Sequence, residues 1–217
     1  MDIQVWADFQ CPYCMIGKKR LYKALEELGI TDAQVSVRSF LLSPERAGAD
    51  GKSMLKHVVD EYQTTEDKVE QNFKRLEEEG RELGLDMRIS EGKTADAWDA
   101  HRLFQYARTL GLGNRFFDRV QEAMFREGVV ISSHDVLLRL ADEAGLPASE
   151  TREVLKDGSS FLDAVQADYR KALEMNIDYV PYYMSGGVYL FSGDLTLQQY
   201  KDGLQGAYTL RQRVSAG

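Results

Sequence analysis

The sequence predicts an α/β fold in which two β-containing parts are separated by a long helical segment. Three observations support this prediction. Residues 3–43 contain two short apolar stretches on either side of one stretch with helical spacing. Residues 53–175 are helical in period almost throughout, and residues 180–214 return to two short strand-like stretches and a last helix. The expected order is therefore βαβ, a helical block, and ββα.

The first part begins with a stretch that is typical of a buried strand. Ile3–Phe9 is short, apolar and rich in β-branched and aromatic residues. A helix is expected from Cys11 onward, with Gly29 suited to its C-terminal cap. Gln34–Ser43 alternates and then turns apolar, which predicts a second strand. Strand, helix and strand at this spacing form a βαβ unit with a right-handed crossover.

The middle of the chain divides into helices at recurring signals. Most of the periodic segments end at a glycine, which favours helix termination. Thr65 is expected to cap the start of one helix, and either Ser132 or Ser133 the start of another. No repeat of solenoid length is visible, so the block is predicted to be a helical insertion rather than an array.

The last forty residues predict a β-hairpin and a final helix. Val180–Gly187 and Val188–Gly193 are two strand-like stretches joined by a tight Ser-Gly-Gly turn, and Leu195–Val214 has helical spacing. Pro181 opens the first of these strands, although proline is disfavoured in central strands. A trans proline at the start of a strand is one explanation. A cis proline facing a functional site, with the Val180 backbone free to pair with an extended substrate, is the explanation that we favour.

Composition and charge exclude several classes of function. The chain of 217 residues is 43% hydrophobic and 29% charged, which is typical of a soluble globular protein. A net charge of −8 disfavours broad binding to nucleic acid or to an anionic membrane. No window approaches the roughly 18 apolar residues of a membrane span, and the N-terminus lacks a signal-peptide pattern. We therefore expect a cytoplasmic protein with no membrane or nucleic-acid partner.

The two cysteines of the chain lie three positions apart in the motif CPYC. Cys11 is predicted at a strand-to-helix junction, where unpaired first-turn amides and the helix dipole stabilise a thiolate. Pro12 falls in the first helical turn, where its missing N–H costs nothing. Cys14 follows one turn later and is close enough to attack a mixed disulfide on Cys11. We therefore predict that Cys11 is the exposed nucleophile and Cys14 the resolving thiol.

A structural metal site is one alternative for a cysteine pair, and a pair without any role is another. Zinc usually needs four ligands, and the chain offers two cysteines and three histidines, His57, His101 and His134, without a paired histidine spacing. In a reducing compartment a CxxC pair without further ligands favours catalysis. We therefore expect no metal.

Three stretches resemble the DsbA family of thioredoxin-fold proteins, and more narrowly its FrnE-like branch. They are DFQCPYC at the start, AWDAHRLFQYA and the residues after it in the middle, and VPYYMSGGVYLFSG near the end. The resemblance implies a thioredoxin-like fold made of residues 1–45 and 177–217, with residues 46–176 as a helical insertion domain. It also implies thiol–disulfide exchange by Cys11 and Cys14, with Pro181 as a cis proline.

The resemblance also indicates substrates and alternatives. The expected substrate-binding residues are Pro12, Tyr13, Val180 and Pro181. The expected partners are proteins or small molecules that carry disulfides or thiols. No metal or organic cofactor is expected, with glutathione considered as a co-substrate. The related glutathione-dependent isomerases and kappa-type transferases typically have serine at the position of Cys11, and a peptide-binding chaperone is a further alternative. The oligomeric state is left open.

The chain departs from the family pattern at two places. Asp96 and Ala97 stand where members often have an Asn-Thr pair, and Tyr179 replaces a glycine before Val-Pro. The chain also lacks the additional cysteine pair that some FrnE-like proteins carry. Trp98 and His101 either face the cleft or pack the insertion against the core, so we leave both out of the predicted catalytic set.

Overall fold

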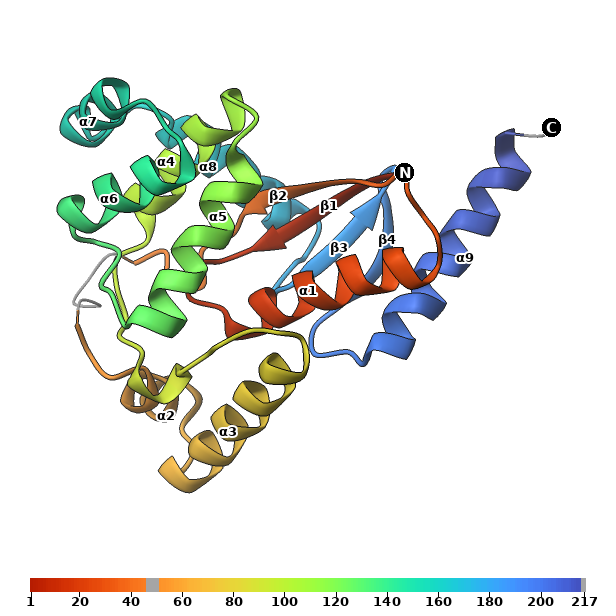
Figure 1. The fold of residues 1–217 in the computed structure, drawn as a ribbon, viewed down its shortest axis with the longest axis horizontal. Helices are drawn as coiled ribbons and strands as arrows, with labels where there is room; N and C mark the ends of the chain where they lie inside the picture. Colours follow the sequence, from red (N-terminus) through yellow and green to blue (C-terminus); the bar gives the residue numbers. More distant parts are fainter. Residues whose placement is uncertain (46–50, 216–217) are drawn as a thin grey trace.

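A four-stranded mixed sheet forms the centre of the molecule, in the order β2-β1-β3-β4 (Figure 1). The computed structural model describes residues 1–45 and 51–215, so the predicted domain boundary at residue 46 lies outside the described residues. β1 and β2 are parallel, and β3 joins β1 and β4 in antiparallel pairs. The strands are β1 (Asp2–Ala7), β2 (Gln34–Ser39), β3 (Tyr182–Ser185) and β4 (Val188–Ser192).

Helices occupy most of the chain between β2 and β3, as the sequence predicts. The first and last helices are α1 (Pro12–Glu27) and α9 (Leu197–Ser215). The segment between β2 and β3 holds α2 (Met54–Tyr62), α3 (Glu66–Glu82), the short 3₁₀ turn η1 (Ile89–Glu91), α4 (Trp98–Thr109), α5 (Gly113–Glu122), the π-helical turn η2 (Ala123–Glu127), α6 (His134–Ala144), α7 (Ala148–Asp157) and α8 (Leu162–Glu174). The predicted α/β fold with a helical insertion is confirmed, while its division into two domains stays a prediction.

Both N-terminal strands end earlier than their apolar sequences predict. β1 ends at Ala7 instead of Phe9, and β2 ends at Ser39 instead of Ser43. The cause is Asp8, whose carboxylate accepts hydrogen bonds from the N–H groups of Gln10, at 2.8 Å, and Leu42, at 2.7 Å. These bonds direct the main-chain N–H groups that follow β1 and β2 to the Asp8 side chain. The chain therefore leaves the strand ladder at both places.

The helix ends follow the predicted signals with small differences. The C-terminal cap of α1 is Leu28, and the predicted Gly29 follows it at a φ of 66°, which suits glycine. Ser133 caps α6 by accepting a hydrogen bond from the Val136 N–H. Thr65 stands at the N-cap position of α3, but its side chain makes no capping bond.

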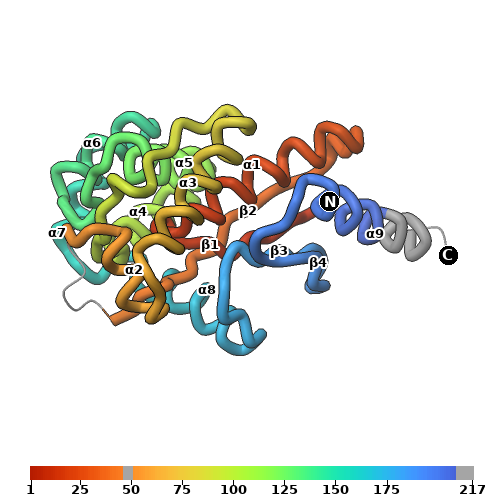
Figure 2. Tube along the Cα trace, turned by 90° about the horizontal axis from the view of Figure 1, so that it is seen from below, coloured from red at the N-terminus to blue at the C-terminus, as the bar shows by residue number. Residues whose placement is uncertain are grey.

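One face of the sheet is covered by α1 and α9 (Figures 1 and 2). Val5, Tyr183 and Phe191 are in register across three strands, so they project to the same side. The Tyr200 hydroxyl of α9 donates to the Tyr183 hydroxyl at 2.9 Å in the buried space between helix and sheet. Gly17 of α1 lies against this pair, so α1 can approach the sheet closely only because position 17 lacks a side chain.

The opposite face of β1 contacts the helical segment through α8. The Trp6 indole N–H donates to the main-chain carbonyl of Asp168 at 3.2 Å. The Asp168 carboxylate accepts hydrogen bonds from the Ser39 N–H at 3.0 Å, the Gln105 amide at 2.8 Å and the Arg108 guanidinium at 3.0 Å. A single acidic side chain of α8 therefore binds β2 and α4 together.

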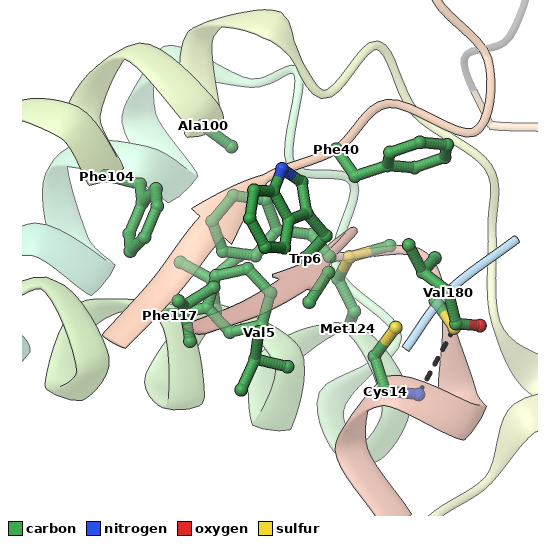
Figure 3. Close-up of a cluster of buried hydrophobic side chains, with 14 of the residues drawn as sticks. Val5, Trp6, Cys14, Phe40, Ala100, Phe104, Phe117, Met124 and Val180 are labelled. Atoms are coloured by element: carbon green, nitrogen blue, oxygen red, sulfur yellow. Dashed lines mark hydrogen bonds between the residues drawn. The ribbon is translucent and has the colours of Figure 1, made fainter. Parts of the chain in front are cut away.

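An aromatic cluster joins the sheet to α4 and α5. Phe9 stacks on Phe117, with ring centroids 4.4 Å apart, and meets Phe104 edge-on. Figure 3 shows Phe104 and Phe117 among the buried hydrophobic side chains of the core cluster that also includes Val5 of the central strand. Large fully buried rings of this kind dominate core energetics. Within the described residues, no helix combines the length and apolar character that crossing a bilayer requires.

We expect Gly17→Ala to destabilise the protein by roughly 1–3 kcal/mol. An added Cβ would lie 2.5 Å from the Tyr200 hydroxyl and 2.6 Å from the Tyr183 hydroxyl, so stiff aromatic side chains would have to move. The matched control is Gly206→Ala on α9, where a Cβ meets nothing within 4 Å. The control should be neutral or stabilise the helix by up to about 1 kcal/mol. Urea unfolding measures both, and equal effects would contradict the close approach of α1.

Candidate functional site

The two cysteines meet at the start of α1, as the sequence predicts. Cys11 has an extended backbone and is the N-cap of the helix, and its sulfur accepts a hydrogen bond from the Cys14 N–H at 3.1 Å (dashed line in Figure 3). The Cys11 thiol in turn donates to the Val180 carbonyl at 3.5 Å. Both cysteines are free thiols. A helix amide that points at a sulfur stabilises its anionic form.

Cys11 is not exposed, which corrects the prediction. Its relative exposure is 3%, and that of Cys14 is 1%. The sequence placed Cys11 at a helix start, but Val180 lies 169 residues away and covers the sulfur from the far side of the fold. The two thiols nevertheless differ, because Cys11 lines a surface groove whose described lining residues do not include Cys14. Burial, together with the hydrogen bond and charge of Cys11, raises the pKa of the Cys14 thiol well above its ordinary value.

The Val180–Pro181 peptide bond is cis, as predicted. Val180 contacts Cys11 through its carbonyl and lines the groove. Pro181 packs behind it toward α1, where its Cγ lies 3.0 Å from the position that a Cβ on Gly17 would take. The geometry thus brings Val180 to the thiol and places Pro181 beneath the groove surface.

The groove beside Cys11 has a volume of about 550 Å³, which is within the usual range of ligand sites. Four of the six predicted site residues line it, namely Cys11, Pro12, Tyr13 and Val180. The sequence did not reveal the remaining walls. These are Leu42 and Ser43 after β2, one face of α2 and α3, residues 178–179 before β3, and residues 193–194 after β4.

The walls contributed by α2 and α3 combine apolar and polar side chains. Both helices show an amphipathic pattern in the sequence, but nothing local indicates that their faces meet the CPYC motif. The apolar lining residues are Met54, Val58, Val69 and Phe73, and the polar ones include His57, Lys68 and Asn72. An elongated ligand with both characters would fit these walls.

Gln121 of α5 holds the loop that carries the thiols, and the sequence analysis missed it. This fully buried amide donates to the carbonyls of Asp8, Phe9 and Cys11 at 3.2, 3.4 and 3.3 Å. The loop between β1 and α1 needs these bonds because its carbonyls lie outside both the sheet and the helix. The helical segment therefore takes part in shaping the CPYC motif.

Trp98 and His101 pack the helical segment instead of facing the groove. Neither is among the described groove residues. His101 is fully buried against Phe9, with ring centroids 4.7 Å apart, and its Nδ1 lies 3.1 Å from the Ser39 hydroxyl. Burial lowers the pKa of His101 to about 3, so it stays neutral. Trp98 donates from its indole to the Pro44 carbonyl at 3.1 Å.

Asp8 is the second functional residue that sequence reasoning missed. It has no exposed surface, and burial raises its pKa to about 6 although the Gln10 and Leu42 N–H groups partly offset this effect. Its negative charge is one of the causes that raise the pKa of Cys14. A search of the described residues finds no group of three or more acidic, histidine or cysteine side chains that could hold a metal ion.

Comparison with known proteins gives consistent matches. The family model described as DSBA-like thioredoxin domain matches residues 2–205. A probable DsbA oxidoreductase from Streptomyces coelicolor is 28% identical, with a TM-score of 0.91 over 96% of this chain and 90% of that chain. The cytosolic disulfide reductase DsbM from Pseudomonas aeruginosa, solved with GSH, is 20% identical, with a TM-score of 0.62 over 98% and 100% of the two chains.

A third similar structure is a 2-hydroxychromene-2-carboxylate isomerase. It is 14% identical, with a TM-score of 0.67, and all of each chain is covered. At this identity, as for the disulfide reductase, the similarity shows the fold alone.

We expect the stability of the wild type to fall, relative to Asp8→Asn, as the pH rises from 4 to 8. The folded state raises the pKa of Asp8 from 3.8 to about 6, so the fold favours the protonated carboxyl. That contribution is complete below the unfolded pKa and is lost as the pH rises through about 6. The unfolding free energy of the wild type minus that of Asp8→Asn should fall by roughly 2–3 kcal/mol between pH 4 and pH 8.

Urea unfolding at several pH values measures this difference. Asp135→Asn, at an exposed position in the first turn of α6, is the matched control for the loss of one negative charge. A difference between wild type and Asp8→Asn that does not depend on pH would show that the Asp8 carboxyl is not held in a desolvated site.

Proposed function

Because this chain belongs to the family of DSBA-like thioredoxin domains, we propose that it is a dithiol–disulfide oxidoreductase that acts through Cys11 and Cys14. The observation that carries the proposal is the 3.1 Å hydrogen bond from the Cys14 N–H to the Cys11 sulfur at the head of α1. This bond stabilises a thiolate at the residue that lines the groove, and leaves the second thiol sealed behind it.

The reduction of a substrate disulfide proceeds in two exchanges. The Cys11 thiolate attacks one sulfur of the substrate, so a Cys11–substrate bond forms, the substrate disulfide breaks, and the leaving thiolate takes a proton. The Cys14 sulfur, having lost its proton, then attacks Cys11 and releases the second substrate thiolate. Two electrons pass from the protein dithiol to the substrate, and a Cys11–Cys14 disulfide remains. The same steps in reverse oxidise a substrate dithiol.

The different positions of the two thiols relative to the groove support this order. Cys11 lines the groove and is the sulfur that a substrate reaches. Burial and the neighbouring Cys11 raise the pKa of Cys14, so Cys14 stays a thiol in the resting protein. Loss of the Cys11 charge on forming the mixed disulfide removes one of the causes of that raised pKa, which favours attack by Cys14 at that step.

Val180 is the proposed substrate-binding residue on the far side of the groove. Its carbonyl accepts a hydrogen bond from Cys11 only while Cys11 is a protonated thiol, and it is free of this bond once Cys11 is a thiolate or forms a mixed disulfide. Its N–H has no hydrogen-bond partner among the described residues. An extended substrate segment would pair with both groups, with Pro12 and Tyr13 lining its path and Pro181 fixing the Val180 backbone.

We propose glutathione as the co-substrate that restores the dithiol, and the cytoplasm as the compartment. The exchange itself needs neither a metal nor an organic cofactor, because the sulfurs carry the electrons. The P. aeruginosa protein of the same fold is a cytosolic disulfide reductase and was solved with GSH, which supports both proposals. The groove of about 550 Å³ is large enough for a molecule of tripeptide size.

Glutathione-dependent isomerisation is the second candidate, favoured by the fold that this chain shares with the 2-hydroxychromene-2-carboxylate isomerase. In that chemistry the residue at position 11 would stabilise the thiolate of bound glutathione, and a serine would suffice. The second thiol, Cys14, has no role in that reaction, so its presence within one turn of Cys11 favours exchange.

Substitution of each cysteine tests the main proposal. We expect Cys11→Ser to abolish disulfide exchange, because it removes the attacking sulfur. Cys14→Ser should accumulate mixed disulfides, because the resolving sulfur is gone. In the reduced wild type, Cys11 should be alkylated at least tenfold faster than Cys14 near pH 7, because its sulfur accepts a helix amide and lines the groove. Mass spectrometry measures both the trapped adducts and the alkylation rates.

Cys11→Ser also separates the alternatives. Retained or increased glutathione-dependent turnover of a small aromatic substrate by this variant would favour isomerisation. Protection of a client protein from aggregation by both variants, with no disulfide exchange by the wild type, would favour a peptide-binding chaperone instead.

A further inference from the structure

Three tyrosines border the groove beside Cys11, and they are held differently. Tyr13, from the CPYC motif, accepts a hydrogen bond from the Asn72 amide of α3 at 2.7 Å. Tyr179 accepts a hydrogen bond from the Ser192 hydroxyl at 2.9 Å. Tyr62, at the end of α2, is 68% exposed, and its hydroxyl has no hydrogen bond among the described residues. Two of the three rings are therefore anchored.

The Asn72 amide is itself fixed in orientation. Its oxygen accepts a hydrogen bond from the Arg75 guanidinium at 2.8 Å, so its NH₂ group must face the Tyr13 hydroxyl. Arg75 also forms ion pairs with Glu79 at 2.7 Å and with Asp194 at 2.8 Å. The orientation of the Tyr13 ring thus depends on a chain of contacts that leads away from the thiols.

This chain of contacts ends in a closed ring of four charges. Arg20 of α1 pairs with the same two carboxylates, with Glu79 at 2.7 Å and with Asp194 at 3.2 Å. The ring joins α1, α3 and the segment between β4 and α9. All four side chains are less than half exposed, and networked pairs of this kind contribute more than isolated surface pairs.

We propose that Asn72 is a positioning residue for the exchange reaction, an inference that rests on the function proposed above. Asn72 holds the Tyr13 ring against the wall formed by α3 and so fixes the angle at which a substrate disulfide approaches Cys11. Thiol–disulfide exchange needs the attacking sulfur in line with the bond that breaks, and small errors of orientation are costly. A disulfide-bonded polypeptide is long enough to contact this wall, so its rate of exchange depends on how the Tyr13 ring is held. A small alkylating reagent reaches the Cys11 sulfur without contacting the wall, so its rate of reaction does not.

Four variants test this role in the full-length protein. Asn72→Leu keeps the branched shape of the side chain and removes both hydrogen bonds. Asn72→Asp still accepts from Arg75 and lets the Tyr13 hydroxyl donate, so it is the conservative rescue. Tyr13→Phe keeps the ring and removes only the hydroxyl. Gln71→Leu is the matched control, because Gln71 occupies the adjacent exposed position of α3.

Two rates are compared for each variant under single-turnover conditions. The first is exchange of the reduced protein with a disulfide-bonded polypeptide such as insulin, and the second is alkylation of Cys11 by iodoacetamide. We expect Asn72→Leu and Tyr13→Phe each to slow exchange about tenfold, the effect of one hydrogen bond in the transition state. Alkylation should stay within about twofold of wild type. Asn72→Asp and Gln71→Leu should resemble wild type in both rates.

The double variant Tyr13→Phe with Asn72→Leu decides whether the two residues act as one unit. Their effects on exchange should not add, because each substitution breaks the same bond. Additive effects, an equal loss in alkylation, or an equal loss in Gln71→Leu would overturn the inference. Unchanged exchange in Tyr13→Phe, which poses the least risk to folding, would overturn it as well. A wild type that exchanges with no disulfide would instead remove the proposed function and this inference with it.

Discussion

The buried carboxylate of Asp8 is the interaction on which the geometry of the site depends. It ends β1 and β2 at the same edge of the sheet by accepting the N–H groups of Gln10 and Leu42. Because β1 ends there, Phe9 is free to enter the aromatic core and Cys11 stands at the head of α1. The cost is a desolvated acid beneath two thiols, which is reflected in its pKa of about 6. A charge placed there raises the pKa of Cys14, so strand termination and thiol chemistry share one cause.

Local signals in the sequence were sufficient to predict the helices and strands and the position of the two thiols. The CPYC motif lies at a strand-to-helix junction, and the Ser-Gly-Gly turn closes the hairpin, with Gly186 and Gly187 at positive φ. These features depend on residues that are neighbours in the chain. The early end of β2, the burial of Cys11 and the Gln121 contacts depend on residues more than 30 positions apart, and a single sequence carries no local signal for them.

The helical segment does more than cover the sheet. Gln121 of α5 satisfies three carbonyls of the loop between β1 and α1, and Asn72 of α3 contacts the tyrosine between the two cysteines. The amphipathic pattern of these helices predicts that each one buries its apolar face. The pattern does not identify the part of the protein against which that face packs. Their polar contacts make the geometry of the motif depend on both the sheet and the helical segment. This explains why CPYC alone predicted the position of the thiols at a helix start but neither the shape nor the burial of the site.

The carbonyl that covers the Cys11 sulfur has a consequence for the newly synthesised chain. Cys11 and Val180 are separated by 169 residues, so the sulfur stays without its cover until about four-fifths of the protein has been synthesised. During that interval both thiols are open to oxidants and to other nascent chains, and a contact of such long range forms late. The thiols of a ribosome-bound intermediate would therefore react less selectively than those of the finished fold, in which Cys11 lines the groove formed by the described residues.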